Sequence, residues 1–214
     1  MASKVQICNL ALLRLGASQI QSVDEDSNEA YYCKAFYDDV RKEVLRDHPW
    51  NFATAIDTPA ALSDETPPDW AYAFRVPSGC LRVLRLLPQA SSSSDSTTLS
   101  WAEAVASSPL YSAENKSDDT IEYEIREDKH ILTNTEDIVV KYIKDITDPV
   151  QFDAAFVTAM SYRLAADLAM PITEDGAKQQ GMMEIYERQL FKAKGQDAKE
   201  GRKHKKTNFI DARD

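Results

Sequence analysis

Apolar residues recur at helical spacing near the start of the chain, and this spacing predicts two helices. The first is expected over residues 3–15, where Gly16 supplies a C-terminal stop. The second is expected over residues 27–47, because Pro49 disfavours helical backbone at the residue before it. Two such helices with a short polar connector favour an antiparallel pair. The two apolar stripes consist of Val5, Cys8, Leu12 and Leu15, followed by Ala30, Cys33, Tyr37, Val40 and Val44.

Between Trp50 and about Ile146 the pattern changes to alternation typical of strands. Residues 88–120 hold ten serines and few large apolar groups, which predicts a long surface loop; a short strand at Thr98–Trp101 is its one candidate element. The whole region, residues 50–147, predicts an inserted small antiparallel β-sandwich or barrel domain. The candidate strands are Phe52–Ile56, Tyr72–Val76, Leu81–Leu87, Ile121–Ile125, His130–Thr133 and Ile138–Ile143.

Helical spacing returns after Asp148, which is followed by a proline suited to the first helical position. We expect this helix to end at Pro171 and a further helix to run to about Lys199. The fold expected from these elements is α+β. A four-helix bundle, built from helical pairs at 1–49 and 148–200, is interrupted by the inserted β domain, and residues 201–214 form an extended C-terminal arm.

The charge balance is acidic and uneven. The net charge is −10, with −11 on residues 1–149 and +1 on residues 150–214. A chain with a net negative charge is a poor general binder of nucleic acid, since the phosphate backbone favours clustered cations. No apolar run approaches the roughly 18 residues that a membrane helix needs, so no membrane partner is expected.

The C-terminal arm is the most distinctive local feature. Its cations precede an aromatic–aliphatic pair, Phe209 and Ile210, which favours an arm that docks on an acidic protein surface and buries that pair. A nucleic-acid-binding tail and a solvated chain end are the alternatives. The basic cluster consists of Arg202, Lys203, His204, Lys205 and Lys206.

The search for catalytic or metal-binding motifs gives negative results. The histidines, His48, His130 and His204, fit no zinc motif, and the sequence has neither a phosphate-binding glycine loop nor a nucleophile elbow. Cys80 could be paired with His48 or His130 as a nucleophile, but its place at the start of an apolar strand favours burial. The many carboxylates are expected on the solvated surface. We therefore predict no enzyme activity, no cofactor and no metal.

Four aromatic residues in the second predicted helix form two adjacent pairs. Neighbouring helical residues point about 100° apart, so one member of each pair leaves the core face. This excess of aromatic surface predicts a contact with a neighbouring subunit. The residues are Tyr31, Tyr32, Phe36 and Tyr37.

Two sequence blocks carry a resemblance to a known family. The first contains Ile7-Cys-Asn-Leu-Ala-Leu-Leu-Arg-Leu-Gly-Ala17, Ser27-Asn-Glu-Ala30, Cys33, Tyr37-Asp-Asp-Val-Arg41 and Val44-Leu-Arg-Asp-His-Pro-Trp-Asn-Phe-Ala53. The second contains Phe152-Asp-Ala-Ala-Phe156 and Tyr162-Arg-Leu-Ala-Ala-Asp-Leu-Ala-Met-Pro-Ile-Thr173. Together they resemble the tail tubular protein A family of short-tailed bacteriophages (podoviruses), the head–tail connector or adaptor proteins. The blocks cover both helical pairs, whereas the β insert and the arm match in position and character only.

The resemblance implies a virion protein, made in the host bacterial cytoplasm, that forms a homo-oligomeric ring of about twelve subunits. Such a ring binds the portal protein above and the tail nozzle protein (tail tubular protein B type) below, and tail fibres are a further partner. It forms part of the channel for genome ejection, and an acidic wall would let DNA pass without specific binding. The arm at about 199–214 would bind the portal, and the β insert would face outward or toward the nozzle.

Two other functions stay open at the level of sequence. The first is a phage-associated glycan or peptidoglycan hydrolase built on the β insert, which would need a cleft with a carboxylate of raised pKa. The second is a DNA-binding accessory protein that uses the basic tail. We also expect Pro49 and Trp50 to form the hinge between the bundle and the insert.

Overall fold

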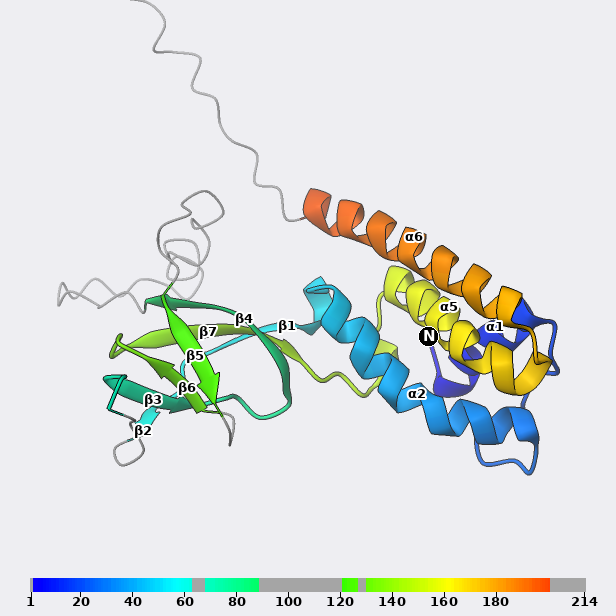
Figure 1. The fold of residues 1–214 in the computed structure, drawn as a ribbon, viewed down its shortest axis with the longest axis horizontal. Helices are drawn as coiled ribbons and strands as arrows, with labels where there is room; N and C mark the ends of the chain where they lie inside the picture. The colour runs from blue at the N-terminus through cyan, green and yellow to red at the C-terminus, as the bar shows by residue number, and fades with distance from the viewer. Residues whose placement is uncertain (1, 63–67, 89–120, 127–129, 201–214) are drawn as a thin grey trace, which may run out of the picture. The chain divides into compact units, whose positions relative to one another are not determined.

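The computed structural model describes residues 2–62, 68–88, 121–126 and 130–200, with side chains up to residue 196. The chain divides into two compact units (Figure 1). One combines Met1–Phe52 with Asp148–Asp214 and is helical, and the other spans Ala53–Thr147 and is built from strands. The predicted serine-rich loop, its candidate strand and the C-terminal arm lie outside the described residues.

The helical unit contains α1 (Lys4–Leu15), α2 (Asn28–Asp47), α5 (Ala154–Thr173) and α6 (Gly176–Glu200), with a short 3-10 helix, η4 (Pro149–Gln151), before α5. Local capping explains where the first two helices begin. The hydroxyls of Ser3 and Ser27 accept hydrogen bonds from the backbone N–H groups of Gln6 and Ala30, at 3.1 and 3.2 Å. Gly16 ends α1 in the left-handed conformation that the stop requires, with φ of 75°.

The end of α5 differs from the prediction. Pro171 does not end the helix but lies within its last turn, and α5 continues to Thr173. The Thr173 hydroxyl donates to the carbonyl of Ala169 at 2.8 Å, and the backbone N–H of Glu174 donates to the carbonyl of Met170 at 3.1 Å, one of the carbonyls left free at a helix end. Glu174, with φ of 53°, then ends the helix in the left-handed region.

The predicted four-helix bundle is wrong. Helix α5 packs against α1, α2 and α6, whereas α1 and α2 contact each other through only a few side chains, among them Lys4 with Asp38 and Cys8 with Cys33. Figure 1 shows α5 flanked by α2 and α6. The cause lies in the composition of α5, which is apolar around most of its circumference and is therefore suited to a central position. Its buried residues are Phe156, Ala159, Met160, Ser161, Leu164, Ala165, Ala166, Leu168 and Ala169.

The strands form two separate antiparallel sheets, with strand orders β1-β7-β4 and β2-β3-β6-β5. The molecule is thus a mixed α/β protein, and the prediction of a bundle with an inserted sandwich or barrel is wrong. The long strand β7 pairs with both β1 and β4, and register shifts in β4 interrupt its pairing with β7. The strands are β1 (Thr54–Asp57), β2 (Ala61–Leu62), β3 (Tyr72–Arg75), β4 (Cys80–Pro88), β5 (Tyr123–Arg126), β6 (His130–Thr133) and β7 (Ile138–Lys144).

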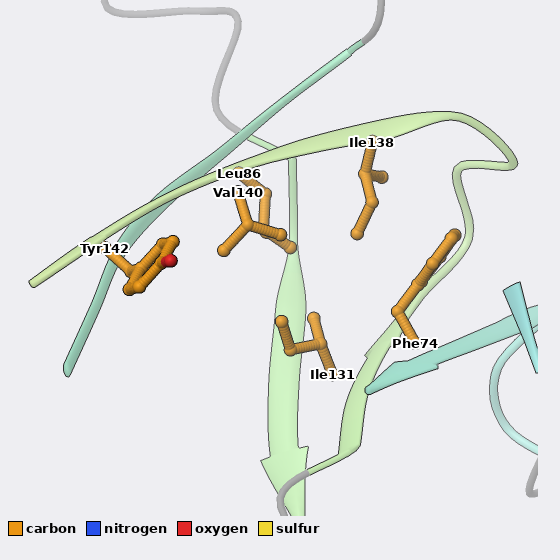
Figure 2. Packing of buried hydrophobic residues seen from close by; sticks show 6 residues of the cluster. All are labelled: Phe74, Leu86, Ile131, Ile138, Val140 and Tyr142. Carbon is orange, nitrogen blue, oxygen red and sulfur yellow. The ribbon is translucent and has the colours of Figure 1, made fainter. Parts of the chain in front are cut away.

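A hydrophobic cluster fills the β unit, and Figure 2 shows its six central side chains directed toward one another. Strands β3 and β6 contribute Phe74 and Ile131, both almost inaccessible to solvent. Strands β4 and β7 contribute the remaining members, Leu86, Ile138, Val140 and Tyr142. Strands from both sheets therefore share one core, which stabilises the unit by removing apolar surface from water.

Candidate functional site

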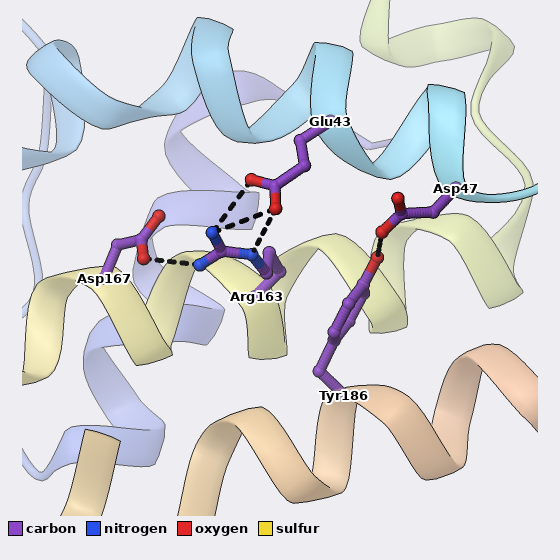
Figure 3. A network of polar contacts seen from close by, with 5 residues as sticks. All are labelled: Glu43, Asp47, Arg163, Asp167 and Tyr186. Atoms are coloured by element: carbon purple, nitrogen blue, oxygen red, sulfur yellow. Dashed lines mark hydrogen bonds and ion pairs between the residues drawn. The ribbon is translucent and has the colours of Figure 1, made fainter. Parts of the chain in front are cut away.

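A polar network joins α2 to α5 in the helical unit (Figure 3). The Nε of Arg163 donates to Oε1 of Glu43 at 3.2 Å, and its Nη2 donates to Oε1 and Oε2 of the same carboxylate at 3.1 and 2.8 Å. Its Nη1 donates to Asp167, one turn further along α5. Burial acts to lower the pKa of Arg163, but Asp167 and Glu43 outweigh it and raise the pKa. The cation is thus firmly held between two carboxylates.

A second polar contact joins α2 to α6. The hydroxyl of Tyr186, on α6, donates to Asp47 in the last turn of α2. The Tyr186 side chain is 2% exposed, and burial, together with this hydrogen bond, raises the pKa of its phenol well above the ordinary value. Figure 3 shows this contact close to the Arg163 network, so three helices are tied together within one region.

An aromatic cluster lies where α2 ends and α5 begins. Trp50 is 1% exposed and makes edge-to-face contacts with His48 and Phe156, at centroid distances of 5.0 and 5.2 Å. Its Nε1 donates to the carbonyl of Val44 at 2.9 Å, which satisfies one of the free carbonyls at the end of α2. Of the two residues predicted to form a hinge, Pro49 is exposed and Trp50 is buried within the helical unit.

Helix α1 is held against α5 by a separate cation. Arg14 lies over the ring of Tyr162, with 3.5 Å between the guanidinium carbon and the ring centroid, and donates to the hydroxyl of Ser161. Burial lowers the pKa of Arg14. The loop after α1 is fixed by Asn9, whose amide exchanges two hydrogen bonds with the backbone of Ile20, at 2.8 and 2.9 Å.

These groups are arranged to hold helices together rather than to activate a nucleophile. Cys8 and Cys33 are fully buried, and the hydrogen bond that the Cys8 thiol donates to Cys33, together with burial, raises the pKa of Cys8. Cys80 is half-buried in β4. Within the described ranges no three histidine, cysteine or acidic side chains gather as metal ligands would. In the same part of the chain, no helix has the length and apolar character to cross a membrane.

The aromatic residues predicted to contact a neighbouring subunit are distributed over two environments. Tyr31 is 69% exposed, and Tyr32 and Phe36 are half-buried, with Tyr31 packed edge-to-face on Tyr32 at 5.4 Å. Tyr37 lies in the core, where Lys4 is 4.5 Å from its ring centroid. The structure therefore places three of the four at the surface.

The residues predicted for the portal-binding arm, Arg202, Lys203, His204, Lys205, Lys206, Phe209 and Ile210, all lie outside the described residues. Sequence reasoning did not identify the Arg163 network or Tyr186. The spacing of Arg163 and Asp167, one turn apart, was a usable signal for part of it. Phe191 was also missed, and its 80% exposure makes it the most exposed of the large apolar side chains that the structure describes.

The chain was compared with known protein families and with curated protein sequences. No family model matches the chain, and no curated protein sequence matches it.

Proposed function

We propose that this protein is a structural adaptor of a short-tailed bacteriophage, which assembles as a ring between the portal vertex and the tail nozzle and forms part of the ejection channel. The proposal starts from the two sequence blocks that resemble tail tubular protein A. It assigns no enzyme activity and no cofactor to the chain.

The observation that carries the proposal is that the two blocks, which are far apart in the sequence, contact each other in the fold. Trp50 of the first block packs on Phe156 of the second, at a centroid distance of 5.2 Å. Arg163 of the second block binds Glu43, which immediately precedes Val44 of the first. The quoted residues therefore act as structural contacts of one helical unit, as expected for a family defined by its architecture rather than by a catalytic site.

Surface character gives further support. The helical unit exposes large apolar side chains on separate helices, among them Tyr31, Met170 and Phe191. Several separate contact surfaces suit a subunit that has ring neighbours as well as partners above and below. The net charge of −10 suits a channel wall, because an acidic surface repels DNA phosphates.

The test is docking of the purified chain on its portal protein, measured by co-sedimentation with and without residues 201–214. We expect the full chain to co-sediment and the truncated chain to bind more weakly, with unchanged circular dichroism. Equal binding by the truncated chain would contradict the role of the arm. Absence of portal binding by the full chain would contradict the adaptor function itself. Glycan hydrolysis by the chain would then support the hydrolase, and salt-sensitive retardation of duplex DNA would support the DNA-binding accessory protein.

A further inference from the structure

The C-terminal half of α6 presents an aromatic side chain in a basic setting. Phe191 is 80% exposed, and Arg188 and Lys194, three residues before and after it, lie on the same side of the helix and are also exposed. From Glu187 to Gln196 there are three cations and one carboxylate. We refer to Arg188, Phe191 and Lys194 as the basic face of α6.

The N-terminal half of α2 has the opposite character. Tyr31 is 69% exposed, and Asp38 lies on the same side of α2 two turns later, where it pairs with Lys4 and Arg41. Asp39, next to it, is also exposed. Residues 24–39 contain six carboxylates and one lysine, Lys34. We refer to Tyr31, Asp38 and Asp39 as the acidic face of α2.

The two faces lie at opposite ends of the helical unit. Helices α2 and α6 both run antiparallel to α5 and therefore run in roughly the same direction (Figure 1), and the Tyr186–Asp47 hydrogen bond fixes their relative position. From this bond Tyr31 lies sixteen residues back along α2, and Phe191 lies five residues forward along α6. At a rise of about 1.5 Å per residue the two rings are separated by roughly 30 Å along the helices, so they do not contact each other within one chain.

We propose that the basic face of α6 in one copy of this chain docks on the acidic face of α2 in the next copy. Each face carries one exposed aromatic ring to bury and charges that complement the other face, and such complementarity selects the partner and its orientation. Because two different surfaces meet, the contact is heterologous and propagates from copy to copy. The inference rests on the proposed function, in which ring neighbours must meet, and names the surfaces that they use.

The first test is sedimentation velocity of the full chain up to about 1 mM in low salt, a range that detects weak association. We expect association that grows with concentration, weakens in high salt, and weakens at least about tenfold in Phe191→Ser. Leu13→Ser is the matched control, since Leu13 is 53% exposed on α1 and lies outside both faces, and it should leave association unchanged. A wild-type chain that stays monomeric, or a Phe191→Ser chain that associates as the wild type does, would overturn the proposal.

A charge exchange tests the pairing itself. One variant, Arg188→Glu with Lys194→Glu, makes the α6 face acidic, and the other, Ala35→Lys with Asp39→Lys, makes the exposed α2 face basic. Each variant alone should fail to associate, whereas an equimolar mixture should associate, because every contact in an alternating assembly again joins opposite charges. A mixture that remains monomeric contradicts the pairing. Portal docking, measured in parallel, separates this proposal from the proposed function. A chain that docks on the portal but does not use the α6–α2 contact refutes only the contact. A chain that associates through this contact but does not dock on the portal refutes only the adaptor function.

Discussion

Replacing Trp50 by alanine tests how the helical unit is held together. The indole is 1% exposed, contacts His48 and Phe156 edge-to-face, and donates to the carbonyl of Val44 at 2.9 Å. Truncating a buried tryptophan to alanine costs about 3–5 kcal/mol, and the lost hydrogen bond adds about 1 kcal/mol. We therefore expect Trp50→Ala to lower the free energy of unfolding by about 4–6 kcal/mol.

The assay is urea unfolding followed by far-ultraviolet circular dichroism, because the helices belong to the unit that contains Trp50. A loss of this size is a large part of the total stability of an ordinary domain, so Trp50→Phe provides a milder variant. It keeps a six-membered aromatic ring but loses the five-membered ring with its N–H donor, and we expect a loss of about 2–3 kcal/mol.

Phe191→Ala is the matched control for Trp50, because it removes an aromatic ring that is 80% exposed. Its effect should stay within about 0.5 kcal/mol of zero. If Trp50→Ala had an effect as small as this control, the ring would not be buried between α2 and α5, and the reasoning from that packing would be refuted.

Two further predictions concern the polar network. In a double-mutant cycle of Glu43→Ala and Arg163→Ala, we expect a coupling of about 1 kcal/mol, since Glu43 is 44% exposed and solvent screens the pair; a coupling near zero would show that the two side chains act independently. The raised pKa of Tyr186 predicts a loss of stability as the pH rises above about 10, because the unfolded chain then ionises this phenol while the folded chain keeps it neutral. Urea unfolding at pH 8 to 11 should show a smaller alkaline loss in Tyr186→Phe, and equal losses would contradict the assignment.

Helix positions could be predicted from the sequence where the determinants are local. The N-cap at Ser3 and the stop at Gly16 depend on a few neighbouring residues, and α1 lies between them as expected. The last two residues of α5 were not predicted, because a proline near a helix end can be accommodated when later N–H groups still donate to the helix carbonyls.

The packing of the helices could not be predicted in the same way, because it depends on tertiary contacts. A short connector favoured direct pairing of α1 with α2, but both helices pack mainly on α5. The alanines of α5, such as Ala159 and Ala165, were recognised as allowing close approach, yet they lie on different sides of the helix, and this was the signal for a central position. The Glu43–Arg163 contact spans 120 residues, and no local pattern identifies such a pair.

Electron microscopy of the full chain mixed with its portal protein tests the central claim most directly. The account predicts a closed ring of copies of this chain, of about twelve by the family resemblance, seated against one face of the portal with an open channel through its centre. Single unassembled molecules beside bare portal particles, at concentrations where the partners are in excess, would contradict it.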